Sequence, residues 1–234
     1  MRRKQGMVLY CTVMLVLIGI CIGVGRVTAE SYIDNVKLED YLKREDITIA
    51  YYDMGFDEVT NRGYLDNDEI KELDDLMEQD TVIVKAKIND NVKRELYYEC
   101  ILSQVQIIEV YQGSIEGDEY INIFEPVDCG FKDQILCADG YSMMQSGEEY
   151  ILFLKTLQNT YYGDDKYVYA PSSTRYSKYA VNDKVPTLFR YEELEELNSM
   201  HYYNEIKDQE IYLHEQDDYE KYLTLKQQVL DTFS

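Results

Sequence analysis

The chain has 234 residues, of which 13% are aromatic, and its 45 acidic and 23 basic side chains give a net charge of −22. This apolar content excludes a wholly disordered chain. The excess of acidic groups argues against nucleic acids and anionic lipid surfaces as partners. We expect one domain of moderate size with appended segments. Its acidic exterior keeps the protein in solution or, alternatively, offers a face for a basic partner or for cations.

The N-terminus carries a candidate membrane segment. Three basic residues, Arg2, Arg3 and Lys4, precede an uncharged apolar run at residues 7–25. The length of this run is close to that needed to span a bilayer, about 20 residues. Because positive charges stay on the cytoplasmic side, we expect a single-pass protein of the cell membrane whose C-terminal domain is extracellular. The small residues that end at Ala29 also fit a signal-peptidase site, and cleavage there predicts a secreted protein.

Export changes the interpretation of the cysteines. Cys129 and Cys137 flank a seven-residue segment and are candidates for a disulfide in an oxidising compartment. Cys100 then remains as a buried thiol, although sequence alone leaves all three pairings of these cysteines open. Their spacing matches no zinc-ligand pattern, so no metal site is predicted.

The first half of the extracellular part mixes helix and strand signals. A short helix is expected within residues 30–46, followed by a strand at 47–53 and a loop. Residues 66–79 predict a second helix with Asp66 as its N-cap and Glu69 closing a capping box. A calcium loop here is rejected because Lys71 occupies the position that needs glycine.

The longest strand signal runs from Glu95 to Gly113 and follows a half-buried strand at residues 81–88. Its alternation of inward and outward side chains reverses at Ile107–Ile108. A β-bulge at this point is expected to turn Ile108 and Val110 inward and to bend the strand, as the closure of a barrel requires.

Further strands are expected at residues 119–125, 166–171 and 177–182, with a long insertion at 125–145. Residues 150–154 form a continuous apolar run, which indicates a strand buried on both faces. At the C-terminal end we expect a short acidic helix at 191–197 and a longer one at about 216–233. The apolar stripe of this last helix is interrupted by Lys226 and is expected to pack on the barrel or, alternatively, to bind a partner. It comprises Tyr219, Tyr222, Leu223, Val229, Leu230 and Phe233.

This succession resembles a group of exported proteins of Gram-positive bacteria. The resemblance covers about residues 66–185 and is carried by EVYQG at Glu109–Gly113 and GEEYILFL at Gly147–Leu154. It implies a small barrel of the oligonucleotide/oligosaccharide-binding (OB) type, as also found in netrin modules and tissue inhibitors of metalloproteinases. These inhibitors chelate zinc through an N-terminal cysteine, and nothing corresponds to it here, so the resemblance implies the fold rather than the inhibition.

The search for chemistry yields no catalytic, cofactor-binding or metal-binding residues. His201 and His214 belong to no metal-binding helix motif, and no nucleophile elbow, phosphate-binding loop or dinucleotide fingerprint is present. Tyrosines that lie on or beside predicted strands are the remaining candidates, because aromatic rings on a barrel face can stack on sugars or bind peptides. The candidate binding face comprises Tyr97, Tyr111, Tyr120, Tyr167 and Tyr169.

The sequence therefore predicts an α+β protein, mainly β with flanking helices. Residues 1–29 are a membrane anchor or signal peptide, 30–65 a lead-in segment, 66–188 an OB-like, netrin-like antiparallel barrel and 189–234 a C-terminal helical segment. The expected function is that of a non-enzymatic module outside the membrane that binds a protein or a cell-envelope ligand. The alternatives are an accessory or immunity subunit of a membrane complex and a hydrolase with an unrecognised site.

Overall fold

The structure is a computed structural model that describes residues 38–52, 65, 67–77, 81–89, 94–97, 100–115, 119–131, 133–157, 168–189 and 201–234. All of them belong to one compact unit, Leu38–Ser234. The predicted membrane segment at residues 7–25 and the predicted helix at 191–197 lie outside the described residues. Within the described residues, no helix has the length and apolar character that crossing a bilayer requires.

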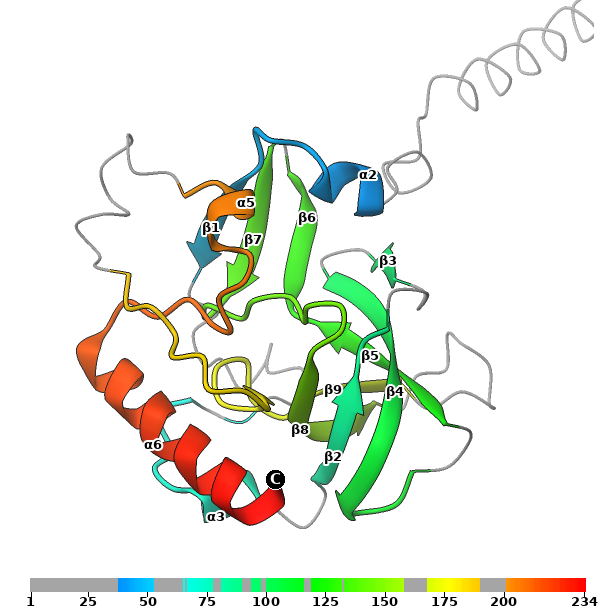
Figure 1. Cartoon of the computed structure of the whole chain (residues 1–234), viewed down its shortest axis with the longest axis vertical. Helices are drawn as coiled ribbons and strands as arrows, with labels where there is room; N and C mark the ends of the chain where they lie inside the picture. Colours follow the sequence, from blue (N-terminus) through cyan, green and yellow to red (C-terminus); the bar gives the residue numbers. More distant parts are fainter. Residues whose placement is uncertain are drawn as a thin grey trace, which may run out of the picture. The chain divides into compact units, whose positions relative to one another are not determined.

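The unit is mainly β (Figure 1). Its helices are α2 (Leu38–Leu42), α3 (Leu73–Leu76), α5 (Tyr203–Ile206) and α6 (Gln216–Phe233). Its strands are β1 (Thr48–Tyr52), β2 (Val82–Lys87), β3 (Arg94–Tyr97), β4 (Cys100–Gln112), β5 (Tyr120–Glu125), β6 (Val127–Phe131), β7 (Gln134–Ala138), β8 (Glu149–Leu157), β9 (Val168–Pro171) and β10 (Lys178–Ala180).

Five of these strands close into a barrel. The ring runs β2–β4–β5–β9–β8 and returns to β2, and β10 adds to the free part of β8. Neighbouring strands are antiparallel except for β5 and β9, which are parallel. The inward side chains form one apolar cluster that includes Val84, Val105, Ile123, Leu152 and Tyr169. This arrangement confirms the prediction of a small, mainly β barrel with flanking helices.

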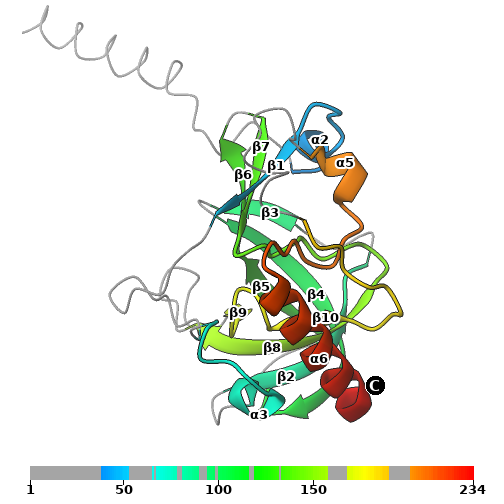
Figure 2. The ribbon, with the colours of Figure 1, turned by 90° about the vertical axis from the view of Figure 1, so that its left-hand side faces the viewer.

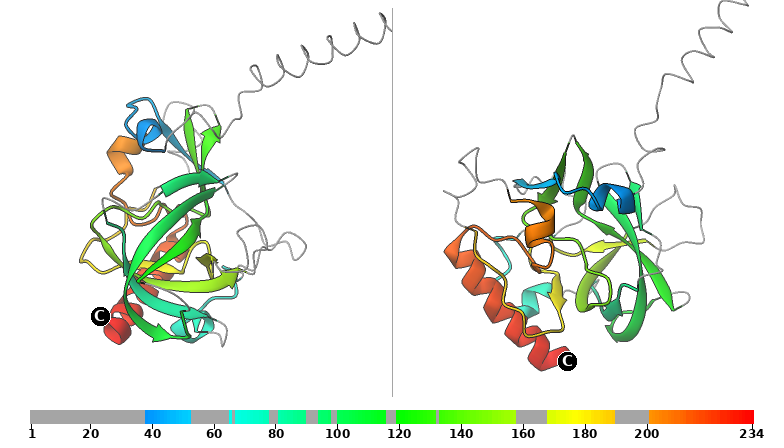
Figure 3. Two further views of the ribbon diagram at one scale, coloured as in Figure 1. Left: turned by 90° about the vertical axis from the view of Figure 1, so that its right-hand side faces the viewer. Right: turned by 45° about the horizontal axis from the view of Figure 1, so that its top comes forward.

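The predicted bulge lies where the alternation of β4 reverses. Lys85 pairs with Glu109 and Ala86 with Ile107, so Ile108 is the extra residue, and β4 is visibly curved (Figure 3, left). The bulge does not turn the next side chains into the core, however. Ile108 is 46% exposed and Val110 42% exposed, although Val110 pairs with the buried Val84, and β4 has a second register shift beyond Val110.

The long run from Glu95 to Gly113 is two strands rather than one. β3 turns back on β4, with Tyr97 opposite Cys100 and Arg94 opposite Ser103. Because Tyr98 and Glu99, which connect the two arms in the sequence, are not typical turn residues, no turn signal marks the reversal.

Strand β8 is buried on both faces, as its continuous apolar run predicted. Tyr150 and Leu152 point into the barrel, whereas Ile151 and Phe153 lie under α6. Figure 2 shows α6 lying across β10, β8 and β2. The terminal helix therefore packs on the barrel wall.

The predicted helix at residues 66–79 is shorter than expected. Only α3 is helical, and the Asp75 carboxylate accepts the backbone N–H groups of Lys71 and Glu72 at its start. Asn67 instead forms hydrogen bonds with residues far away in the sequence: it accepts one from Ser173 and donates one to Asp139. These tertiary contacts compete with a helix that starts at Asp66.

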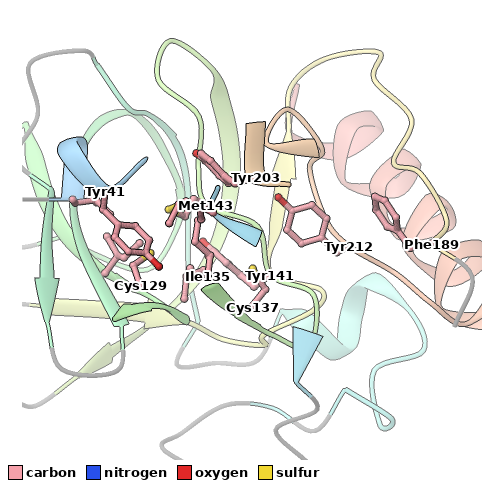
Figure 4. Close-up of a cluster of buried hydrophobic side chains, with 13 residues drawn as sticks. Tyr41, Cys129, Ile135, Cys137, Tyr141, Met143, Phe189, Tyr203 and Tyr212 are labelled. Atoms are coloured by element: carbon pink, nitrogen blue, oxygen red, sulfur yellow. The ribbon is translucent and has the colours of Figure 1, made fainter. Parts of the chain in front are cut away.

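The predicted insertion at residues 125–145 contains a second sheet. Strands β6 and β7 form a hairpin, and β1 adds to it in parallel with β7 (Figure 1). The lead-in segment thus contributes a strand to this sheet. A separate apolar cluster that includes Tyr41, Cys129, Ile135, Cys137 and Tyr212 lies beside it (Figure 4).

Candidate ligand-binding face

The outer face of β3, β4 and β5 is the surface on which exposed apolar and uncharged polar side chains gather. On β4, Ile101, Ser103 and Val105 are buried, so the residues between them point outward. The strand register then places Leu102 opposite Phe124, Gln104 opposite Asn122 and Gln106 opposite Tyr120. We call this surface the β3–β5 face; it comprises Tyr97, Leu102, Gln104, Gln106, Ile108, Tyr120, Asn122 and the buried Phe124, together with the exposed Glu95 opposite Leu102 and the half-buried Cys100 opposite Tyr97.

Exposure singles out this part of the barrel. Six large hydrophobic side chains are exposed in the described residues, and four of them, Tyr97, Ile108, Val110 and Tyr120, belong to β3, β4 and β5. The other two are Val185 and Tyr202. Exposed apolar side chains scattered singly are common, but a group on neighbouring strands marks a candidate interaction site.

Two side-chain amides lie at the centre of the face. Gln104 and Asn122 are half-buried and directly opposite each other, and neither makes a side-chain hydrogen bond within the part of the chain that the structure describes. Gln106, by contrast, accepts a hydrogen bond from Asn89 at 2.6 Å and donates one to Glu119. The two free amides together offer four N–H donors and two carbonyl acceptors to a ligand.

Aromatic rings stand at both ends of the amide pair. The rings of Tyr97 and Phe124 are in contact, with centroids 5.2 Å apart and planes inclined by 38°. Tyr120 stands at the other end, 41% exposed. The alternation of β5 places Tyr120, Asn122 and Phe124 in one row.

The structure brings together two of the five tyrosines predicted for a binding face, Tyr97 and Tyr120. Tyr169 is 1% exposed and belongs to the barrel core, so its assignment to the face is wrong. Tyr111 lies beside α6, where its hydroxyl donates to the carbonyl oxygen of Phe233 and its ring contacts that side chain. Tyr167 lies outside the described residues.

Sequence reasoning missed the uncharged members of the face. Gln104, Asn122 and Phe124 alternate with the apolar residues that predicted the two strands, so their outward direction could be read from the sequence. What the sequence did not show is the register that sets Gln104 opposite Asn122.

The predicted disulfide is absent from the structure, in which Cys129 and Cys137 are free and buried. Cys129 lies beside Tyr41 in the cluster of Figure 4. Burial raises the pKa of both thiols, that of Cys137 to about 12. Cys100 is half-buried, and its thiol donates to the carbonyl oxygen of Tyr97.

A buried network of charges lies between β10 and α6. The Lys178 ammonium donates to the carbonyl oxygens of Ser142 at 2.6 Å and Glu210 at 3.0 Å. The Glu210 carboxylate accepts from Lys226 at 2.5 Å, from the Tyr222 hydroxyl at 2.7 Å and from a backbone N–H of β10 at 2.6 Å. Burial lowers the pKa of Lys178 to about 8, although Glu125 and Glu210 oppose the shift.

Within this network, Ser142 and Lys178 have the spacing of a nucleophile and its base, with 3.1 Å between hydroxyl and ammonium. The Ser142 hydroxyl, however, donates to the carbonyl oxygen of Glu210, and Ser142 and Lys178 are 1% and 4% exposed. The pair therefore links the C-terminal segment to the barrel.

A second polar cluster surrounds Arg175. Its guanidinium pairs with Asp218 of α6 and donates to the Tyr51 hydroxyl at 3.0 Å, and the Tyr176 hydroxyl donates to Asp218 at 2.6 Å. His214 packs edge-on against Tyr51, and burial, assisted by Arg175, lowers the pKa of His214 to about 4. The cluster joins β1, the loop after β9 and α6.

The described residues contain no group of three or more potential ligands that could hold a metal ion. No protein-family model matches the chain, and no curated protein matches it in sequence.

Proposed function

We propose that the chain is a non-enzymatic binding module, held on the outer side of a cell membrane by residues 7–25, whose ligand contacts the β3–β5 face. The observation that carries this proposal is the gathering of three exposed large apolar side chains, Tyr97, Ile108 and Tyr120, on the outer face of three neighbouring strands. The net charge of −22 makes a protein or a neutral envelope component the expected partner, rather than a nucleic acid.

The barrel type supports the same assignment. Counted along the chain, the ring order is first, second, third, fifth and fourth strand, which is the arrangement expected of the OB-like, netrin-like barrel that the sequence resembles. OB barrels use the face of their second and third strands for ligands, and these strands correspond to β4 and β5. Docking to a membrane complex through α6 has less support, because the apolar stripe of α6 is buried on the barrel.

The test is binding of the full chain, held in detergent micelles, to cell walls isolated from a Gram-positive bacterium. We expect the double variant Tyr97→Ala/Tyr120→Ala to bind at least about tenfold more weakly, because exposed aromatic side chains dominate such interfaces. Tyr202→Ala is the matched control, since Tyr202 is equally exposed outside the face. Equal binding by the double variant and the wild type contradicts the proposal.

A further inference from the structure

The centre of the β3–β5 face is uncharged but able to form hydrogen bonds. The opposed amides of Gln104 and Asn122 can donate and accept at the same time. A hydroxyl group also donates and accepts, so a row of hydroxyls can use both functions of each amide. A carboxylate or phosphate can only accept. It also meets the repulsion of Glu95 on the face and Glu119 beside it, which the cation opposite Gln106, Lys87, offsets only in part.

The aromatic side chains extend this uncharged centre into a strip. The exposed Tyr97 packs on the buried Phe124. Phe124 and the exposed Tyr120 are four residues apart on β5, which corresponds to about 13 Å along a strand. This length exceeds a single sugar ring and suits a chain of several. The faces of aromatic rings pack well against apolar C–H surfaces, which sugar rings present beside their hydroxyls.

The barrel disfavours an extended peptide as the ligand. Peptides that add to a sheet use the free backbone groups of an edge strand. β4 lies between β5 on one side and β2 with β3 on the other, and β5 lies between β4 and β9. Among the described strands of this face, only the four-residue β3 is an edge strand. A helix that docks in a groove needs an apolar centre, whereas the centre of this face consists of amides.

We infer that the β3–β5 face binds an uncharged polysaccharide that lies along β4 and β5, with Gln104 and Asn122 bonded to its hydroxyls and the rings of Tyr97 and Tyr120 packed on its sugar rings. This inference rests on the proposed function and specifies its ligand. It goes beyond a general aromatic binding face because it assigns the hydrogen bonds to two amides that have no partner in the described residues.

Isothermal titration of the full chain in micelles tests the inference with three hexasaccharides. These are cellohexaose and the N-acetylglucosamine hexamer, which are neutral, and the galacturonate hexamer, which is anionic. We expect at least one neutral probe to bind and the anionic probe not to bind. Gln104→Ala should weaken binding by about two- to tenfold, the effect of one hydrogen bond. Gln106→Ala should change it by less than about twofold, because that amide already has protein partners.

The outcomes separate the ligand class from the proposed function. If no neutral probe binds, or the anionic probe binds as well, while wall binding still depends on Tyr97 and Tyr120, the polysaccharide inference is wrong and the binding face stands. If neither sugars nor cell walls respond to changes on the face, both proposals fail. Equal effects of Gln104→Ala and Gln106→Ala also overturn the assignment of the free amides.

Discussion

At the residue scale, the buried carboxylate of Glu210 connects the C-terminal segment to both β10 and α6. It accepts hydrogen bonds from Lys226, Tyr222 and a backbone N–H of β10. Lys226 interrupts an otherwise apolar stripe in the sequence, and its partner lies 16 residues away. The interruption is visible in the sequence, but the ion pair that accounts for it is not, because local patterns carry no information on contacts at that separation.

Removing one partner of this pair should destabilise the fold strongly. We expect Lys226→Met to lower the free energy of unfolding by about 3 kcal/mol, because it leaves a buried carboxylate without its cation. Glu210→Leu should cost more, since it leaves the buried Lys226 cation without its counter-charge and a backbone N–H of β10 without its acceptor. The double variant should cost less than the sum of the two. Denaturant unfolding followed by tyrosine circular dichroism measures these changes. A loss below about 0.5 kcal/mol for Lys226→Met, typical of a surface site, would show that the pair is not buried in solution.

The lowered pKa of Lys178 makes a prediction about pH. Its folded-state pKa is about 8, whereas a lysine in an unfolded chain titrates near about 10.4. Between these values the unfolded state binds the proton that the folded state has released, so the contribution of Lys178 to stability rises with pH. Between about pH 8 and pH 9.5, the free energy of unfolding of the wild type should therefore rise by about 1 to 2 kcal/mol relative to that of Lys178→Met.

Unfolding titrations of both proteins at these two pH values measure the change. Comparing the two proteins largely cancels the buried cysteines and tyrosines, whose raised pKa values act in the opposite direction at high pH. A difference that stays constant over this pH range would mean that Lys178 keeps an ordinary pKa in the folded state.

At the scale of elements, single strands and helices could be predicted from their own residues, but their partners could not. The strands at residues 81–88 and 119–125 and the terminal helix were predicted from periodicity alone. The reversal at Ile107–Ile108 correctly indicated a bulge, because a change of alternation is a local property. The β3–β4 hairpin and the second sheet were missed, since both depend on pairing between segments, which no pattern within a single segment shows.

The same limit applies to the terminal helix, because the sequence did not show which of its leucines is buried. The sequence stripe included Leu223, whereas the structure buries Leu225 fully and leaves Leu223 half-buried. We expect Leu225→Ala to cost about 3 kcal/mol, as for other buried leucines, and Leu223→Ala about 1 kcal/mol or less. Thermal or denaturant unfolding of the two variants checks the order. If Leu223→Ala is the more damaging change, α6 packs with a different face against the barrel.

At the scale of the whole described unit, the C-terminal segment joins the barrel to the second sheet. The backbone at Tyr202 bridges to Thr48 of β1, Tyr212 donates to the carbonyl oxygen of Gly140 at 2.8 Å, and Glu210 connects to β10 and α6. Apart from the contact of Glu210 with Lys226 of α6, which spans 16 residues, these contacts join residues at least 30 apart in sequence. The barrel was predictable because its strands have strong patterns, whereas this connection has no signal in the sequence.

A substitution at Gly140 can test whether the barrel and the second sheet unfold together. It has a φ of +80°, and a Cβ atom there would lie 1.8 Å from the carbonyl oxygen of Tyr212. Gly147 has a similar φ of +85° but no atom within 4 Å of that position. Gly147→Ala should therefore lower the free energy of unfolding by only about 1 to 2 kcal/mol, which is the cost of placing a residue with a side chain in the left-handed backbone conformation. Gly140→Ala should cost at least about 2 kcal/mol more, because the C-terminal segment must move away from β7.

Hydrogen exchange in the two variants shows how far the effect of each substitution extends. If the C-terminal segment couples the two parts, Gly140→Ala should lower the protection of amides in β7 of the second sheet and in β8 of the barrel by the same free energy. Gly147→Ala should lower both by the smaller amount. Loss of protection in β7 alone would show that the second sheet opens independently of the barrel. In that case the contacts of Glu210 would stabilise only the barrel and α6.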